Sequence, residues 1–313
     1  MTLPLSAPSA LLVVLVPALV AAAPPEKGQT FQAPGATIYV EVLGTAAGAP
    51  LVVVNGGPGF DHTYEHVAMP GTTSAWETLA RGRRVVFYDQ RGNGRSGALK
   101  ASQTCTLADQ ISDLDAVRAH LGADKIDLVG HSWGGYLVMA YAARHPDRVR
   151  HLVTVDSAAP KWSETVYLFK DIFPEGQERS DSHAFGDALG DPAATDAQLR
   201  EYMSWLFYAP EKRDAFLAQI NITTKVYTRS VNEALDRDLQ RFDLNPEIRK
   251  FKFPTLVITG RYDINVAPSV AYKMHKAIPG SKFMVFERSG HLPFFEEPEP
   301  FVRAIESFLG APR

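Results

Sequence analysis

Ile126-Asp127-Leu128-Val129-Gly130-His131-Ser132-Trp133-Gly134-Gly135-Tyr136 is the stretch that decides how this chain folds. A short apolar run ends in Gly-x-Ser-x-Gly, and a helix-compatible run of small and apolar residues follows it. A serine on a sharp turn between a strand and a helix needs this pattern, because side chains at Gly130 and Gly134 would collide with the neighbouring strand and helix. The stretch therefore predicts a nucleophile elbow that holds Ser132 above the carboxyl edge of a sheet.

Further apolar runs on both sides of this turn alternate with segments of helical spacing. The expected strands cover residues 36–42, 51–54, 84–88, 126–129, 149–155, 255–259 and 282–286, and the expected helices cover residues 106–122, 133–143, 267–277 and 300–309. Strands that alternate with helices predict an α/β fold with a mostly parallel central sheet flanked by helices. We assign residues 30–156 and 251–313 to this core.

Residues 157–250 break the alternation of strands and helices. This stretch has no buried-strand run, is rich in aromatic residues and contains polar turns such as Asp191-Pro192 and Asn245-Pro246. We expect several helices that form a cap inserted between two strands of the core.

The first 25 residues contain no charged side chain. An apolar region over residues 11–20 precedes Ala21-Ala22-Ala23 and a Pro-Pro pair, which is typical of a signal peptide cleaved near Ala23. We therefore expect residues 1–23 to be a leader and the protein to be periplasmic or secreted. Once the leader is removed, we expect no stable association with a membrane.

The composition of the chain narrows the classes of function. The formal net charge of the 313 residues is −3 and no run of Lys and Arg occurs, so nothing indicates binding to nucleic acid. The single cysteine, Cys105, excludes an intrachain disulfide framework and a multi-cysteine metal site. The sequence predicts neither a metal nor another cofactor, and it does not determine the oligomeric state.

A serine hydroxyl needs a base to remove its proton during attack on a carbonyl carbon. In this kind of sheet the partners follow in the order Ser, Asp or Glu, His. Of the nine histidines, only His291 follows the last expected strand, in Ser289-Gly290-His291-Leu292-Pro293, on a loop at the carboxyl edge. We expect His291 to be the base.

Two aspartates are candidates for the acid that orients this histidine. Asp263 follows the penultimate strand and Asp156 follows an earlier one. We favour Asp263 because the strand that delivers His291 comes directly after it, and its role would be to hold the imidazole tautomer and stabilise the imidazolium.

The glycine-rich turn Asn55-Gly56-Gly57-Pro58-Gly59 follows an earlier strand of the core. Two fixed backbone N–H groups can stabilise the charge that develops on a carbonyl oxygen during attack. We assign these oxyanion donors to Gly57 and to Trp133, the residue directly after the nucleophile.

These segments together resemble the α/β-hydrolase fold and, more narrowly, the proline iminopeptidase family of serine peptidases. The resemblance rests on the Asn55–Gly59 turn, where that family usually has His-Gly-Gly-Pro-Gly, on Tyr88-Asp89-Gln90-Arg91-Gly92, and on the loops that carry Ser132, Asp263 and His291. It covers residues 30–156 and 251–313, whereas the cap matches poorly.

The resemblance implies an exported aminopeptidase that releases N-terminal proline or another small apolar residue through an acyl-enzyme on Ser132. In that family, carboxylates of the cap bind the free amino terminus, and here Glu233 and Glu201 are the candidates for this role. The alternative is an esterase or lactonase with the same triad, so the expected partner is a small peptide or ester substrate. A binding protein without catalysis is disfavoured because serine, aspartate and histidine are all in place.

Overall fold

The computed structural model describes residues 28–100, 102–220 and 228–310. The strands are β1 (Gly28–Ala33), β2 (Ala36–Leu43), β3 (Leu51–Val54), β4 (Val85–Asp89), β5 (Ile126–His131), β6 (Val149–Val155), β7 (Thr255–Gly260) and β8 (Lys282–Phe286). The helices are α1 (Ala75–Leu79), α2 (Leu107–His120), α3 (Trp133–Arg144), α4 (Phe169–Ile172), α5 (Pro174–Ala188), α6 (Pro192–Ser204), α7 (Pro210–Gln219), α8 (Arg229–Leu239), α9 (Asn245–Ile248), α10 (Pro268–Ala277), α11 (Pro293–Glu296) and α12 (Pro298–Leu309).

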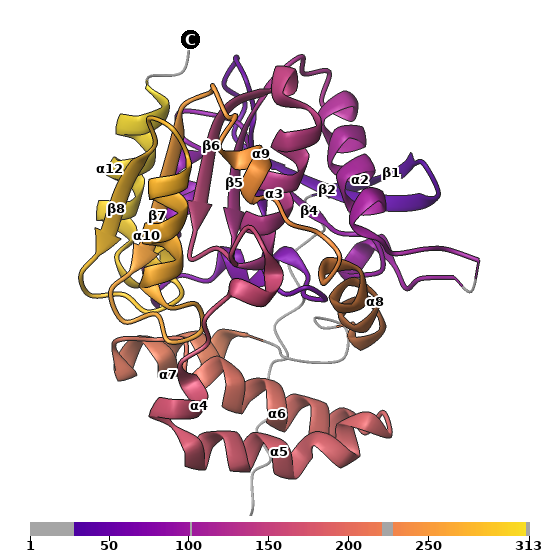
Figure 1. Ribbon diagram of the computed structural model, residues 1–313, viewed down its shortest axis with the longest axis vertical. Coiled ribbons are helices and arrows are strands. Elements are labelled where there is room, and N and C mark those ends of the chain that lie inside the picture. The colour runs from indigo at the N-terminus through magenta and orange to yellow at the C-terminus, as the bar shows by residue number, and fades with distance from the viewer. Residues whose placement is uncertain (1–27, 101, 221–227, 311–313) are drawn as a thin grey trace, which may run out of the picture.

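The eight strands form one sheet in the order β1-β2-β4-β3-β5-β6-β7-β8. The pairs β1–β2 and β2–β4 are antiparallel, and the strands from β4 to β8 pair in parallel. The predicted mostly parallel sheet is therefore confirmed, and the carboxyl ends of the parallel strands meet at one edge, which is the lower edge in Figure 1.

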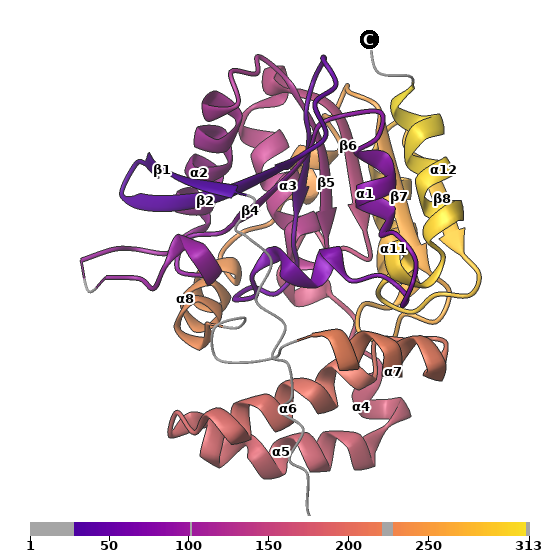
Figure 2. The same cartoon turned by 180° about the vertical axis from the view of Figure 1, so that it is seen from behind.

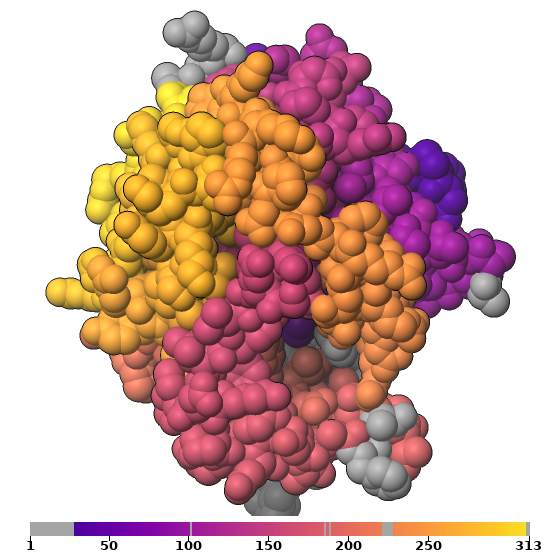
Figure 3. Space-filling view, viewed as in Figure 1, coloured from indigo at the N-terminus to yellow at the C-terminus, as the bar shows by residue number. Residues whose placement is uncertain are grey.

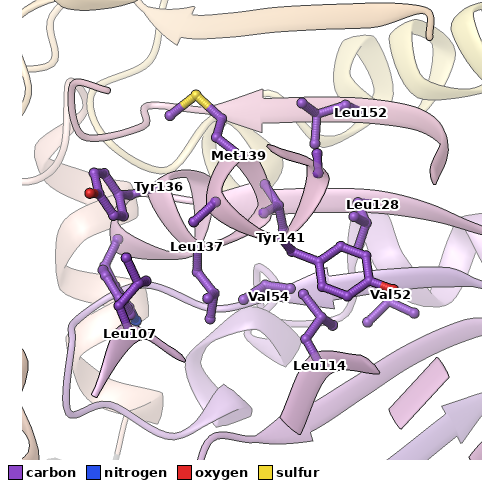
Figure 4. Packing of buried hydrophobic residues seen from close by; sticks show 14 of the residues in the cluster. Val52, Val54, Leu107, Leu114, Leu128, Tyr136, Leu137, Met139, Tyr141 and Leu152 are labelled. Carbon is purple, nitrogen blue, oxygen red and sulfur yellow. The ribbon is translucent and has the colours of Figure 1, made fainter. Parts of the chain in front are cut away.

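Both faces of the sheet are covered because consecutive side chains of a strand point to opposite faces. In β3, Val52 and Val54 belong to the core that includes α2, α3 and α10, whereas Leu51 and Val53 belong to the core that includes α1 and α12. Figures 1 and 2 show these two sets of helices on opposite sides of the sheet. Figure 4 shows how the side chains of α3 fill the first core against β3, β5 and β6.

Two local predictions can be compared with the structure. The helix expected over residues 106–122 begins with a capping box in which Thr106 and Asp109 exchange hydrogen bonds, as the sequence pattern predicts. The apolar run at Lys282–Phe286 favours a strand that is buried on both faces, but its residues alternate between exposed and partly buried up to Phe286. The reason is that β8 is an edge strand, with only β7 beside it.

The described residues between β6 and β7 form helices and turns, and the isolated bridge between Lys161 and Asp243 is the β pairing among them. Helices α5, α6 and α7 lie beyond the carboxyl edge of the sheet, while α8 lies at its side (Figures 1 and 2). The expected leader, residues 1–23, lies outside the described residues. Among the described residues, no helix is both long and apolar enough to span a bilayer.

Candidate active site

Ser132 lies in the turn between β5 and α3, in a backbone conformation that residues other than glycine rarely adopt (φ 55°, ψ −120°). The turn is as tight as the sequence predicts. A Cβ on Gly134 would lie 2.0 Å from the Val54 carbonyl oxygen, and one on Gly130 would lie 2.3 Å from the Gly134 carbonyl oxygen. The backbone N–H of Ser132 donates to the Val155 carbonyl at 2.9 Å, which fixes the turn to the neighbouring strand.

The loops after β7 and β8 bring Asp263 and His291 together. His291 Nδ1 donates to Asp263 Oδ2 at 2.8 Å, and both side chains are buried. The other oxygen, Asp263 Oδ1, accepts the backbone N–H groups of Asn265 and Val266, each at 2.9 Å. Asp263 therefore orients the imidazole so that Nε2 carries the lone pair that proton transfer requires.

Ser132 and His291 line the same narrow cavity beneath the cap. No hydrogen bond joins the Ser132 hydroxyl to His291 among the described residues, and Asn265 Nδ2 lies 3.1 Å from His291 Nε2. Contacts of this kind are often long in unliganded enzymes and tighten when substrate binds. The structure thus places the two groups in one cavity without joining them.

Asp156, the second candidate for the acid, lies beside this pair and does not replace Asp263. It has a positive φ of 46°, and its Oδ1 accepts the Gly260 backbone N–H at 2.8 Å. Its carboxyl group, that of Asp263 and the His291 ring have polar atoms within 4.8 Å of one another. Burial and the charge of Asp263 raise the pKa of Asp156 well above its usual value. Burial also raises the pKa of Asp263, to about 8, although the backbone N–H groups of Val266 and Asn265 oppose this rise. Asp156 therefore holds a proton more strongly than Asp263 does.

Burial in this cluster also changes the basicity of the histidine. It lowers the pKa of His291 from 6.5 to about 4, because a buried imidazolium loses its solvation. The titratable groups that face His291 are Asp263, Asp156 and His131, whose ring centre lies 4.7 Å away. His291 is thus neutral, as a general base must be, down to acidic pH.

The turn after β3 lies against the nucleophile. A Cβ on Gly56 would be 3.0 Å from Ser132 Cβ, and Gly57 (φ 129°) lines the cavities beside Ser132. Asn55 holds the turn, since its Nδ2 donates to the carbonyls of Gly56 at 3.0 Å and Phe60 at 2.8 Å. An asparagine therefore stabilises the turn in the place where the resembling family usually has histidine.

The second expected oxyanion donor, Trp133, is the first residue of α3. The first N–H groups of a helix have no intrahelical acceptor, so this group is available to a ligand oxygen. The Trp133 indole Nε1 donates to Gln90 Oε1 at 2.8 Å, which connects the start of α3 to the loop after β4.

His131 takes part in the site in a way that the sequence analysis missed. Its Nε2 lies 2.8 Å from the His291 carbonyl oxygen, and its Nδ1 lies 2.7 Å from the Tyr64 hydroxyl. That hydroxyl accepts the backbone N–H of Gly56 at 2.6 Å. A buried chain of hydrogen bonds thus joins the turn after β3 to the loop that carries the base. No pattern in the sequence marks Tyr64 as part of the site. His131 could have been included, because it directly precedes Ser132 in the sequence.

The expected cap carboxylates are not brought to the nucleophile. Glu233 on α8 has a side chain that is 53% exposed and paired with Arg229 at 2.8 Å. Glu201 on α6 is paired with Arg179 at 2.7 Å. Both carboxylates already have a cation as partner, and neither is among the described residues that line the cavity next to Ser132.

That cavity has a volume of about 740 Å³ and lies between the core and the cap. Figure 3 shows a hollow on this face, between the segment that follows β6 and the orange surface of α8. Among the described residues the lining is mostly apolar and aromatic, with Lys170 as its one charged side chain: Gly57, Pro58, Ser132, Trp133, Ala158, Trp162, Thr165, Val166, Tyr167, Phe169, Lys170, Tyr202, Asn232, Asn265 and Val266. Several aromatic residues of the cap thus face the cavity, as a slot for a flat ring would require.

A second group of possible metal ligands among the described residues consists of Glu41, His62 and His66. His62 stands between Asp89 Oδ1 at 2.6 Å and Glu41 Oε2 at 3.4 Å. Burial alone would lower the pKa of His62, but these carboxylates raise it to about 9. A protonated imidazole therefore supplies the positive charge of this cluster.

Residues 49–298 match the model of the family described as alpha/beta hydrolase fold. The chain belongs to this family. The α/β-hydrolase fold also agrees with solved structures. An esterase from Rhodococcus aligns with a TM-score of 0.74 at 23% identity, over 92% of this chain and 100% of its own. An enol-lactonase from Burkholderia xenovorans aligns with a TM-score of 0.67 at 23% identity, over 90% of this chain and 99% of its own.

Curated relatives of this α/β hydrolase confirm the narrower resemblance. A proline iminopeptidase of Clostridium botulinum is 29% identical over 87% of this chain and 94% of its own length. A probable proline iminopeptidase of Leptolyngbya boryana is 30% identical over 82% of this chain and 85% of its own. The protein is therefore a hydrolase similar to proline iminopeptidases along most of its length.

Proposed function

We propose that the protein is an exported serine hydrolase that cleaves an amide or ester bond through an acyl-enzyme on Ser132. The observation that carries this proposal is the meeting of the Ser132 turn, the hydrogen-bonded Asp263–His291 pair and the turn at Gly57 around one cavity. The proposed export rests on the charge-free apolar region that begins the chain.

The reaction would follow from the positions of these groups. His291 Nε2 takes the proton of Ser132 as Oγ attacks the carbonyl carbon, and the backbone N–H groups of Gly57 and Trp133 stabilise the negative oxygen. His291 then gives its proton to the leaving amine or alcohol. Water, activated by the same histidine, releases the acyl group and restores the serine.

The first candidate for the substrate is a peptide whose N-terminal proline or small apolar residue is released. The similarity to proline iminopeptidases over most of the chain supports it. The aromatic residues of the cap that face the cavity would suit the flat pyrrolidine ring of proline.

The second candidate is an ester or lactone, and one observation favours it. The described lining of the cavity includes no carboxylate to bind a free ammonium group, and the two cap glutamates are paired with arginines. A chain without amine recognition would not reject a substrate whose amino group is blocked or absent.

One comparison of substrates tests these candidates. Turnover of a proline arylamide with a free amine is measured against its N-acetylated twin and a simple aryl ester. A peptidase prefers the free amine, whereas equal rates on the blocked and free amides would exclude the peptidase and leave the esterase. Ser132→Ala should abolish every activity, by up to roughly 10⁶-fold in kcat, without changing the melting temperature appreciably.

The role of Glu233 is tested in the same assay. Because Glu233 is exposed and paired with Arg229, we expect Glu233→Gln to leave the ratio of free to acetylated substrate unchanged. The matched variant Glu201→Gln should behave alike. If Glu233→Gln removed a preference for the free amine while ester hydrolysis continued, this glutamate would be the amine ligand after all.

A further inference from the structure

The nitrogen that must accept the serine proton already has a partner. His291 donates its Nδ1 proton to Asp263, so Nε2 carries the lone pair, and Asn265 Nδ2 lies 3.1 Å from it. An amide N–H of Asn265 therefore donates to the nitrogen that the reaction requires. Ser132 lines the same narrow cavity without a hydrogen bond to His291 among the described residues.

The orientation of Asn265 is fixed from two sides. The Tyr202 hydroxyl donates to its Oδ1 at 3.1 Å, and its own backbone N–H donates to Asp263 Oδ1 at 2.9 Å. The residue is buried, with 5% of its surface exposed. Because the amide oxygen faces Tyr202, the amide nitrogen faces His291.

Tyr202 connects this chain of hydrogen bonds to the cap. It lies on α6, and together with Asn265 and Ser132 it lines the cavity of about 740 Å³. The same helix leads into Leu206, whose carbonyl oxygen accepts the His291 backbone N–H at 2.7 Å. A ligand that fills the cavity therefore contacts Tyr202 and Asn265 as well as Ser132.

We infer that Asn265 is a positioning residue that holds His291 in a resting arrangement, and that Tyr202 couples the release of His291 to filling of the cap cavity. The inference rests on the serine-hydrolase function proposed above. A large acyl group displaces Tyr202 and Asn265 and frees Nε2 for the Ser132 proton. A short acyl group leaves them in place, so Asn265 competes with Ser132 for the lone pair.

Two variants separate this role from simple support of the fold. Asn265→Leu keeps a similar volume without a donor, and Tyr202→Phe keeps the ring and removes the hydroxyl. The exposed Tyr272 on α10 provides the matched control, Tyr272→Phe. For each protein, kcat/KM is measured from pH 3.5 to 8 on p-nitrophenyl acetate and on an aryl ester of a bulky acyl group. Thermal unfolding shows whether each variant folds.

The expected result is selective for the short substrate. Asn265→Leu should raise kcat/KM for p-nitrophenyl acetate roughly two- to tenfold, the range that corresponds to one hydrogen bond. The bulky ester should change less. The acid limb should move to higher pH, because a donor to Nε2 opposes its protonation. Tyr202→Phe should act in the same direction more weakly, and Tyr272→Phe should match the wild type.

Two results would overturn the inference. One is an equal loss of rate on both esters with an unchanged acid limb, which indicates that Asn265 only supports the fold. The other is no change in either folded variant. Failure of the proposed function is a separate result, because Ser132→Ala would then retain activity. If Asn265→Leu does not fold, Tyr202→Phe alone decides.

Discussion

Ser132 and Asp156 both have positive φ values, and both are residues for which such values cost energy. A strained non-glycine residue costs about 1–3 kcal/mol and persists only where the surrounding structure fixes it. At Ser132 the surrounding structure includes the bond to the Val155 carbonyl and the two glycines of the turn. The strain lifts the hydroxyl out of the sheet into the cavity.

Gly134 gives a direct test of this turn. Gly134→Ala puts a methyl group 2.0 Å from the Val54 carbonyl oxygen, so strand and helix must separate. We expect a loss of most activity and a loss of unfolding free energy larger than in the control Gly280→Ala. A Cβ on Gly280 would have no atom within 4 Å. Its only cost in unfolding free energy is that of an alanine at a φ of 67°, about 1–2 kcal/mol. Equal effects in chemical denaturation would show that the close approach at Gly134 does not determine the turn.

The lowered pKa of His291 predicts an unusual pH profile. The base works only when neutral, so kcat/KM on a neutral ester falls as the pH drops through the pKa of His291. Burial lowers that pKa from 6.5 to about 4, so we expect full activity at pH 6 and a midpoint of the acid limb well below 6.5. A midpoint at or above 6.5 in a pH–rate profile would contradict the buried, neutral histidine.

Among the single residues of the site, some could be predicted from the sequence and others could not. The serine turn, Asp263 and His291 follow from local patterns and from their order along the chain. Asn265 and Tyr64 do not, because their roles depend on contacts between loops that are far apart in the sequence. Glu233 has the right chemistry for an ammonium, but the position of α8 pairs it with Arg229 instead.

At the scale of elements, the end of β4 and the loop after it support the site without lining the cavity next to Ser132. Asp89 accepts from His62 and from the Arg95 backbone, and Gln90 connects Asn55 to Trp133. The next residue, Arg91, forms a bidentate pair with a carboxylate of α2. The Asp-Gln-Arg-Gly motif thus fixes the ends of several elements relative to one another.

The junction between cap and core depends on Glu296. Its Oε1 accepts the backbone N–H groups of Tyr208 and Ala209, and its Oε2 accepts that of Gly290, beside His291. Glu296→Gln replaces one acceptor oxygen by a donor and leaves at least one of these N–H groups without a partner. We expect a loss of about 1–3 kcal/mol in unfolding free energy and a reduced kcat/KM.

The same substitution at an exposed site provides the control for Glu296. Glu299 is exposed in the first turn of α12, so Glu299→Gln should leave kcat/KM unchanged. Loss of its charge at the helix N-terminus should cost at most about 0.3–1 kcal/mol in unfolding free energy, less than Glu296→Gln. Equal stability of the two variants in urea denaturation would show that Glu296 does not hold the cap to the loop of His291.

At the scale of the whole molecule, the alternation of strands and helices was enough to predict the core. Buried parallel strands read as continuous apolar runs, and the order of Ser132, Asp263 and His291 places them at one edge of the sheet. The arrangement of the cap could not be predicted. Its helices do not belong to a sheet, so no pairing of strands determines which of them lie side by side. The side chains that line the cavity depend on that arrangement, and they decide between a peptide and an ester as substrate.

The proposed function requires Ser132 to be a nucleophile that His291 activates. Its most direct test is labelling of the full-length protein with a fluorophosphonate, with the site located by mass spectrometry. We expect one label, on Ser132, and a labelling rate that falls by several orders of magnitude in His291→Ala. A label on another residue, or an undiminished rate in folded His291→Ala, would contradict it.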